Sequence, residues 1–312
     1  MDIRNNAPEI DALRQGMDWD CEDIERYQIL IETVYGDSHP GSTHLDRLAK
    51  MADDGIKYRG AKPSHFTATD ICDGIAQGHD GMNYSLASRE IIAAMCEIHA
   101  KANGFDGAVF ISSCDKAVPA HLMAMARLNL PSVFVPGGTM PLAADGFTLE
   151  QIGNVNARFK TGELTREQFT QYQKDACTSC GACQFMGTAC TMQVMAEALG
   201  LALPHSALMP ANMKYINNMA KAAGKTVVEL VKKNLRARDI LTEKAFHNAV
   251  VIHGAIGGST NALLHIPVIA REAGLEVKAD LFDELHRKVP FLVDTRPVGK
   301  YSTDMFWYAG GV

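Results

Sequence analysis

The sequence predicts an α/β domain in which helices flank a mostly parallel sheet. The clearest evidence is DGAVFISSCDKAVPAHLMAMARLNLPSVFVPGG at residues 106–138, where an apolar run, a helical run and a second apolar run follow one another. A strand–helix–strand unit takes roughly 30 residues and implies parallel strands with a right-handed crossover. A second strand-and-helix pattern lies at residues 249–273. Alternation of this kind is typical of layered α/β domains.

The expected elements can be placed along the chain. The first 40 residues are polar and mixed in character. Residues 44–56 are expected to form a helix, because their apolar side chains recur on one side, and Gly55 is interpreted as a glycine near its C-cap. Residues 85–103 show a similar helical register.

Within the clearest unit, short strands are expected at 108–111 and 132–135, with a helix at 121–128 between them. Downstream, the apolar and β-branched residues 249–252 are interpreted as another strand, and a glycine-rich loop and a helix follow it. Residues 147–175 form a polar, charge-rich insertion that is expected to fold as short surface helices.

Composition narrows the possible functions. The chain has 312 residues, with 30 Lys and Arg against 36 Asp and Glu, and therefore a formal net charge of −6. A mildly acidic protein lacks the basic face that nucleic-acid binding usually needs. No apolar run approaches the roughly 18 residues that span a bilayer, and the start lacks the apolar core of a signal peptide. These features predict a cytoplasmic protein that binds neither nucleic acid nor membrane, with its eight cysteines reduced.

A thiol, a carboxylate and an amine follow the first predicted strand of the clearest unit. Cys114, Asp115 and Lys116 are consecutive and come shortly after residues 108–111. In parallel sheets, ligands bind at the carboxyl ends of the strands. An ordinary polar loop is the alternative interpretation, but an Asp–Lys pair at the end of a strand has no packing role there. The segment is therefore a candidate ligand-binding loop.

Three cysteines share a strict spacing. Cys177, Cys180 and Cys183 are each three residues apart, and Cys190 follows seven residues later. Iron–sulfur clusters use this spacing, a zinc site can take four thiolates, and a CxxC pair can act in thiol redox chemistry. Small buried thiols without a function are the remaining alternative. The spacing alone does not select one of them.

Other candidate ligands are scattered along the chain. Asp73 lies in the glycine-punctuated segment DICDGIAQGHDGM, and its carboxylate suits a hard cation such as Mg²⁺, with an Asp–Gly turn as the alternative. Ser259 and Thr260 follow two glycines at a predicted helix start, where backbone N–H groups favour an anion, unless they serve only as an N-cap. His39 and His44 are candidate ligands too, although a lone histidine is more often only hydrogen-bonded.

Together these segments resemble the dihydroxy-acid and sugar-acid dehydratases, the iron–sulfur hydro-lyase family that includes phosphogluconate dehydratase. The resemblance is spread over nearly the whole chain in the family's order. The matching segments are HLDRLA at 44–49, DGIAQGHDGMNYSLASREII at 73–92, SCDKAVPAHLMAMARLNLPSVFVPGG at 113–138, GACQFMGTACTMQVMAEALGLALPHSA at 181–207 and GGSTNALLHIPVIAREAG at 257–274. The second and third of these segments are highly specific.

The resemblance implies an iron–sulfur cluster beside a Mg²⁺ ion. By their places in the family's motifs, Cys114 and Cys183 would be cluster ligands, and Asp73, Asp115 and Lys116 would bind Mg²⁺. Lys116 would act in catalysis as a carbamate, because a free ammonium cannot ligate a cation whereas a carbamate presents an anionic oxygen. The motifs leave open whether the cluster has two irons or four.

The sequence departs from the dihydroxy-acid type at one cluster ligand. That type has a cysteine in a Pro-Cys-Asn-x-His-like segment, whereas this chain has Pro-Gly-Ser-Thr-His, so that Gly41 stands in place of the thiol. Cys72 is our first choice for the third ligand, because the phosphogluconate type is similar there. Cys180 is the second choice, with Cys177 and Cys190 behind it.

The resemblance also implies a longer protein. Chains of the family continue into a second, barrel-like domain that supplies a catalytic serine base and a further acidic Mg²⁺ ligand, and this chain ends in YAGGV without a polar tail. Residues 1–312 are therefore expected to be the amino-terminal, cluster- and Mg²⁺-binding domain of a homo-oligomer. On its own the chain is expected to bind the cofactors but to turn over slowly or not at all.

The expected reaction is dehydration of a 2,3-dihydroxy acid to a 2-keto acid. A cluster iron would act as Lewis acid on the C3 hydroxyl, and Mg²⁺ would stabilise the enolate. Gly41, Cys72 and the QFMGTACT segment favour a sugar acid over a branched dihydroxy acid. A zinc-binding domain without catalytic function and a thiol-redox protein using Cys177 and Cys180 are the alternatives, but neither accounts for the carboxylates and the lysine.

Overall fold

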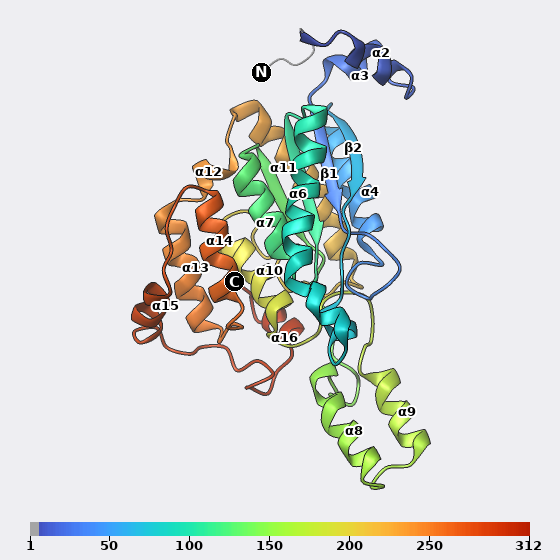
Figure 1. Cartoon of the computed structure of the whole chain (residues 1–312), viewed down its shortest axis with the longest axis vertical. Helices are drawn as coiled ribbons and strands as arrows, with labels where there is room; N and C mark the ends of the chain where they lie inside the picture. Colours follow the sequence, from blue (N-terminus) through green and yellow to red (C-terminus); the bar gives the residue numbers. More distant parts are fainter. Residues whose placement is uncertain (1–5) are drawn as a thin grey trace.

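The computed structural model describes residues 6–312 and shows a parallel sheet enclosed by helices (Figure 1). Within these residues the sheet has four strands in the order β2–β1–β3–β4, and all neighbouring strands are parallel. β1, β3 and β4 are buried along their whole length. The predicted fold class is thereby confirmed. The strands are β1 Gln28–Thr33, β2 Lys62–Thr67, β3 Gly107–Ser112 and β4 Ser132–Pro136.

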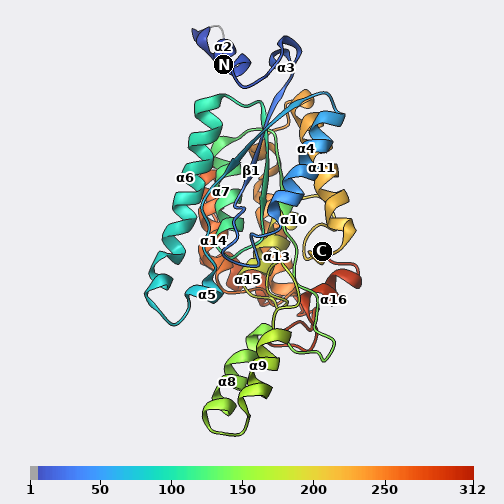
Figure 2. The same ribbon diagram turned by 90° about the vertical axis from the view of Figure 1, so that its right-hand side faces the viewer.

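Helices cover both faces of the sheet (Figure 2). α4 (Leu45–Tyr58) and α11 (Lys214–Lys233) pack together on one face, and α6 (Ser85–Asn103) and α7 (Ala117–Leu128) pack together on the other. α4 connects β1 to β2, α6 connects β2 to β3, and α7 connects β3 to β4. Because β2 and β3 lie on opposite sides of β1, the winding of the chain reverses there. Open α/β sheets bind ligands at such a switch point, beyond the carboxyl ends of the strands.

A further group of helices packs beside α7. α10 (Thr188–Ala198) and α14 (Ala262–Glu272) both contact α7, and α13 (Glu243–Ala255) contacts α10 and α15 (Ala279–His286). Their buried side chains and those of the sheet form one continuous apolar core. Among residues 6–312, no helix combines the length and apolarity that a membrane crossing requires. The shorter helices are α2 Glu9–Gln15, α3 Cys21–Glu25, α5 Asp73–Ala76, η1 Asp80–Tyr84, η2 Leu149–Gln151, α12 Ala237–Ile240 and α16 Thr303–Tyr308.

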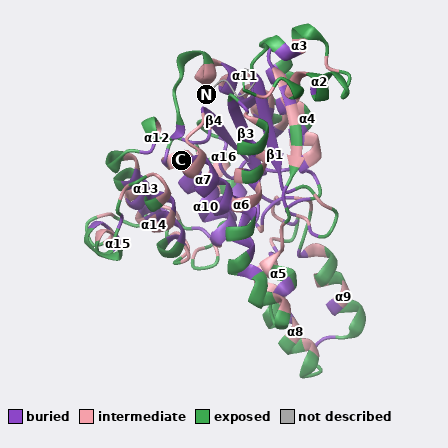
Figure 3. Cartoon of the chain, turned by 45° about the horizontal axis from the view of Figure 1, so that its top comes forward, coloured by how far each residue is buried: buried purple, intermediate pink, exposed green. Residues whose placement is uncertain are grey.

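α8 (Ile152–Lys160) and α9 (Arg166–Asp175) form a hairpin that projects from the body of the molecule (Figure 1). Their apolar side chains pack on one another in a small separate core that includes Val155 and Phe169. The outer faces of both helices are exposed (Figure 3). The expected surface helices within 147–175 are thus confirmed.

The other expected elements are confirmed within a few residues, including the helix at 85–103 and the unit at 107–136, with one exception. The expected strand at 249–252 is wrong, because these residues lie inside α13. Thr242 caps that helix by accepting a hydrogen bond from the backbone N–H of Ala245. A short apolar run does not by itself distinguish a strand from a buried helix. The buried side chains of α13 recur at helical spacing: Phe246, Ala249, Val250 and His253.

Two features of the amino-terminal part correct the sequence analysis. The first 40 residues look polar as a block, yet they contain β1, whose six residues QILIET pair with both β2 and β3. Gly55 lies in the last turn of α4 but is not its C-cap, because the helix continues to Tyr58 and Arg59 is the C-cap. A Cβ on Gly55 would lie 2.1 Å from the carbonyl oxygen of Lys221, so the glycine permits the close packing of α4 on α11.

This close packing leads to a prediction about stability. A Cβ on Gly224 of α11 would lie 2.1 Å from the carbonyl oxygen of Ala52 in α4. We expect Gly224→Ala to lower the free energy of unfolding by about 1–3 kcal/mol, the usual cost of overpacking a core. Gly153→Ala is the matched control, because Gly153 of α8 has open space around it, and alanine there should add about 0.5–1 kcal/mol. Urea unfolding measures both variants, and a Gly224→Ala chain as stable as the wild type would refute the close contact.

Candidate metal centre

The loops that follow β1, β2 and β3 meet around one small cavity. Pro40 and Gly41 follow β1, Cys72 and Asp73 follow β2, and Cys114 follows β3. The cavity that they line has a volume of about 180 Å³. The loops after β1 and β3 flank the switch point of the sheet, so the cavity lies where α/β folds bind ligands.

Four thiols line this cavity. Cys72 and Cys114 come from the loops after β2 and β3, and Cys177 and Cys183 come from the CxxCxxC segment. All four are free of disulfide bonds. The structure therefore brings together the thiols at the two positions that the resemblance marks as cluster ligands, Cys114 and Cys183, and our first choice for the third, Cys72.

Cys180 of the CxxCxxC segment and Cys190, which follows the segment, do not line the cavity. Cys180 is half-buried and lies outside the cavity lining. Cys190 is buried in α10, where its thiol donates to the carbonyl oxygen of Cys183 over 3.1 Å. Among residues 6–312, we find one group of three or more His, Cys, Asp or Glu side chains whose ligand atoms all lie within 4.8 Å of one another. This group contains neither Cys180 nor Cys190. This arrangement does not favour a four-thiolate zinc site built on the CxxCxxC segment.

The two thiols from the strand loops influence each other's protonation. Interaction with the Cys114 thiol lowers the pKa of Cys72 to about 6, although partial burial opposes this shift. The same contact, together with complete burial, raises the pKa of Cys114 well above its usual value. Burial also raises the pKa of Cys183. Cys72 is therefore biased toward the thiolate, which is the form that ligates metals.

Asp73 and Lys116 form an ion pair beside the thiols. Lys116 Nζ lies 2.6 Å from Asp73 Oδ2 and 3.9 Å from Asp115 Oδ2. At the start of α6, Ser85 Oγ lies 2.7 Å and 2.8 Å from the two oxygens of the Asp73 carboxylate and donates to it. The Lys116 side chain is only 7% exposed, so its amine is held among the carboxylates. The three expected Mg²⁺ ligands thus lie together, and Ser85 joins them as a residue that sequence reasoning missed.

Asp115 also contacts the amino terminus of α10. Burial raises the pKa of Asp115, although hydrogen bonds from the Thr188 hydroxyl and the Ala189 backbone N–H oppose the shift. Ser259 approaches the same corner, with its Oγ 3.4 Å from Thr188 Oγ1. Thr260, by contrast, is exposed, and α14 begins two residues later. Of the two expected anion-binding residues, Ser259 is the one whose hydroxyl approaches Thr188 at the start of α10.

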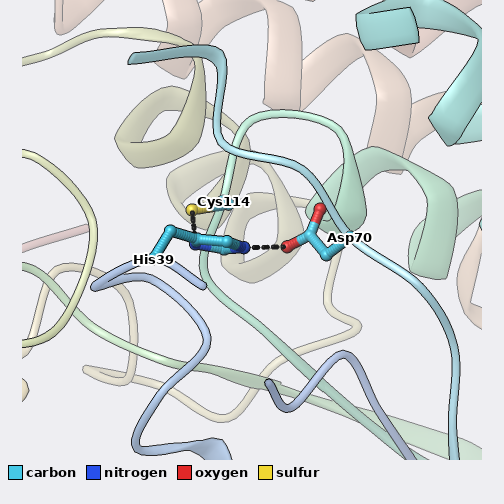
Figure 4. A group of neighbouring side chains, drawn as sticks. All are labelled: His39, Asp70 and Cys114. Atoms are coloured by element: carbon cyan, nitrogen blue, oxygen red, sulfur yellow. Dashed lines mark hydrogen bonds and ion pairs between the residues drawn. The ribbon is translucent and has the colours of Figure 1, made fainter. Parts of the chain in front are cut away.

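His39 and Asp70 lie next to Cys114 (Figure 4). His39 Nδ1 is 3.6 Å from Cys114 Sγ, and His39 Nε2 is 3.5 Å from Asp70 Oδ2. The other candidate histidine, His44, bonds to the carbonyl oxygen of Gly137 over 2.7 Å. Sequence reasoning gave Asp70 no role. Its position could have revealed it, because Asp70 follows β2 and His39 follows β1 at the same edge of the sheet.

The fold and the site define a parallel α/β domain with a combined thiol and carboxylate centre of the kind that holds metal cofactors. The chain belongs to the family whose model is described as dihydroxy-acid/6-phosphogluconate dehydratase, N-terminal, which matches residues 26–312. It is 41% identical over 304 residues to a dihydroxy-acid dehydratase of Acetivibrio thermocellus, 42% over 294 residues to that of Caldanaerobacter subterraneus, and 40% over 304 residues to that of Pyrococcus abyssi.

These alignments cover 96%, 93% and 96% of this chain, and 55%, 53% and 55% of the respective relatives. The chain therefore spans about half the length of the curated relatives that it matches. The family resemblance drawn from the sequence motifs is confirmed, and the match to an N-terminal model agrees with the expected place of the domain.

Proposed function

We propose that this chain is the cofactor-binding part of a hydro-lyase that converts a 2,3-dihydroxy acid into a 2-keto acid. The observation that carries the proposal is the adjacency of two kinds of metal-binding group. Cys72 and Cys114 line one cavity, and each is followed directly by a carboxylate of the Asp73–Asp115–Lys116 group. Thiolates suit iron, whereas oxygen donors suit Mg²⁺. The relatives' name, dihydroxy-acid dehydratase, supports the same class of reaction.

The thiols fit an iron–sulfur cluster. Cys72, Cys114 and Cys183 come from three different segments and face one cavity, as the ligands of a cluster must. Cys177 lines the cavity as well, whereas Cys180 does not, so Cys177 now ranks above Cys180 as a substitute. When bound, the iron would supply Lewis acidity for the departing C3 hydroxyl, and Mg²⁺ would neutralise the charge that develops at the carboxylate end.

The carboxylates are proposed to hold Mg²⁺. Ser85 donates to both oxygens of Asp73, so this carboxylate is positioned before a cation binds. Lys116 would join them as a carbamate, with an oxygen donor in place of the ammonium that now pairs with Asp73. Ser259 and Thr260 are proposed to bind an anionic group of the substrate, a role that the proximity of Ser259 to Thr188 supports.

We propose a sugar acid as the substrate, because Gly41 and Cys72 set this site apart from the dihydroxy-acid type in the way that the phosphogluconate type suggests. The general base is proposed to lie in the part of the family's length that this chain does not span. The isolated chain should then bind the cofactors without efficient turnover. A cytoplasmic homo-oligomer, with the thiols kept reduced, is part of the same proposal.

Metal and sulfide analysis after anaerobic purification tests the proposal. We expect iron with a matching amount of acid-labile sulfide, a visible absorption band, and an EPR signal after reduction. The cavity, with its four thiols, is the reason for this expectation. Zinc without sulfide would refute the proposal and favour a zinc-binding domain. A reversible disulfide between Cys177 and Cys180 without any metal would instead favour a thiol-redox protein.

A further inference from the structure

The surroundings of Gly41 show which atoms occupy the place of the missing thiol. A Cβ built on Gly41 would lie 2.0 Å from Cys114 Sγ and 3.3 Å from His39 Nδ1. Both atoms therefore sit where a side chain at position 41 would project, and Gly41 itself lines the cavity. In this chain, one sulfur and one imidazole nitrogen face the spot that a third cysteine would otherwise use.

His39 is oriented as a metal-binding histidine needs to be. Its side chain is 2% exposed, with Nδ1 toward Cys114 and Nε2 toward Asp70 on the opposite side of the ring (Figure 4). An Nε2–H directed at the Asp70 carboxylate leaves the Nδ1 lone pair facing the sulfur. A carboxylate behind the ring is the usual support of a histidine ligand, because it fixes the tautomer and the ring orientation.

The distance between Nδ1 and Sγ fits two ligands of one metal ion. Two donors of a tetrahedral ion, at about 2.3 Å for sulfur and about 2.0–2.1 Å for nitrogen, lie about 3.6 Å apart. The observed separation of His39 Nδ1 and Cys114 Sγ is 3.6 Å. These two residues and Asp70 also form the one group of three or more ligand atoms within 4.8 Å of one another in the described part of the chain.

Asp70 provides an independent observation. Its side chain is 2% exposed, and within residues 6–312 neither its Oδ2 nor His39 Nε2 makes a hydrogen bond of normal geometry. Burying a carboxylate oxygen without a full partner is costly, and such a group in a native protein requires an explanation, of which a functional role and a bound ion are two. Binding of a metal at Nδ1 would fix the imidazole ring of His39, and its Nε2–H would then donate a hydrogen bond to Asp70 Oδ2.

We propose that His39 Nδ1 and Cys114 Sγ bind the same iron, with Asp70 as the residue that positions the imidazole. The inference rests on the proposed function, because it assumes that the thiols hold an iron–sulfur cluster. Two protein ligands on one iron imply a two-iron cluster, since each iron of a four-iron cluster takes a single one. That iron then has two sulfides and two protein donors, so substrate would have to bind the other iron as an additional ligand beside Cys72 and Cys183. A histidine in place of a thiolate also raises the reduction potential of a cluster.

Pulsed EPR of the chain labelled with ¹⁵N-histidine and reduced with dithionite tests this ligation. We expect a strongly coupled histidine nitrogen and two irons for each wild-type chain. His39→Cys keeps a metal-binding side chain at the site, so the cluster should persist while the nitrogen signal disappears and the reduction potential falls. His65→Gln is the control, because His65 also pairs with a carboxylate, that of Asp53 at 2.9 Å, but on the surface. It should leave signal and potential unchanged.

The outcomes separate this inference from the proposed function. A wild-type chain without iron and sulfide would contradict the proposed function itself. A wild-type chain with a cluster but only weakly coupled histidine nitrogen, or with four irons, would overturn only the ligation by His39. It would leave the proposed function standing. Asp70→Asn keeps the size of the side chain and replaces its carboxyl group with an amide. It should retain the nitrogen signal with an altered coupling and a shifted potential, and an unchanged spectrum would overturn the positioning role of Asp70.

Discussion

Cys114→Ala should lower the iron and acid-labile sulfide of the anaerobically purified chain by about tenfold or more, since even groups that only support a metal ligand contribute about 10–100-fold to affinity. Cys114 is the thiol on which the other contacts converge. Its thiol lowers the pKa of Cys72, its Sγ lies 3.6 Å from His39 Nδ1, and the residue lines the cavity at the switch point of the sheet. Without Cys114, the remaining thiols still line the cavity, but the cluster loses the ligand that lies closest to the other proposed ligands. Iron and sulfide assays on equal amounts of protein measure the effect.

Cys96→Ala is the matched control, because Cys96 is fully buried in α6 and away from the cavity. Both variants remove a buried thiol of the same size, so their thermal stabilities without metal should be similar, and only Cys114→Ala should lose iron. Cys72→Ser should lose iron as well, whereas Cys180→Ser, outside the lining, should keep it. Full iron occupancy in Cys114→Ala would show that Cys114 is not a ligand of the cluster.

The chemistry of the site could be predicted from the sequence, but its assembly could not. Cys114, Asp115 and Lys116 attract attention because they follow an apolar strand. Their partners depend on strand order, which local patterns do not encode. β1 is one of the two inner strands, yet its six residues lie in a segment of polar character. Its pairing with β3 brings the loop containing His39 next to Cys114.

The CxxCxxC segment shows a second limit. A spacing of three would place all three thiols on one face of a helix, but residues 177–186 are irregular. Cys177 and Cys183 face the cavity, and Cys180 does not. The spacing thus predicts metal chemistry but gives no information on which thiols converge. Gly41 is the opposite case: the sequence showed that a thiol was missing, and only the structure shows what occupies its place.

Lys116→Met should weaken the binding of Mg²⁺, or of Mn²⁺ as its EPR-visible substitute, by about 100-fold or more, because loss of a ligand should cost at least as much as loss of a supporting group. For the proposed carbamate to form, the Lys116 ammonium, now 2.6 Å from Asp73 Oδ2, must lose one proton, and the neutral amine must then add CO₂ and release a second proton to become an anionic oxygen donor. Binding by the wild type should therefore weaken in buffer depleted of CO₂ and recover with bicarbonate. The affinity of Lys116→Met should not respond to bicarbonate.

A second lysine provides the control for this prediction. Lys62 also forms a close ion pair, with Asp23, but it is the first residue of β2, whereas Asp73 follows the other end of that strand. Lys62→Met should leave both Mn²⁺ affinity and its bicarbonate dependence unchanged. A carbamate signal in ¹³C NMR after addition of ¹³C-bicarbonate should appear in the wild type and in Lys62→Met and be absent in Lys116→Met. Tight Mn²⁺ binding that ignores bicarbonate in the wild type would mean that Asp73 and Asp115 hold the cation without Lys116, and that its ammonium serves only to pair with Asp73 when the site is empty.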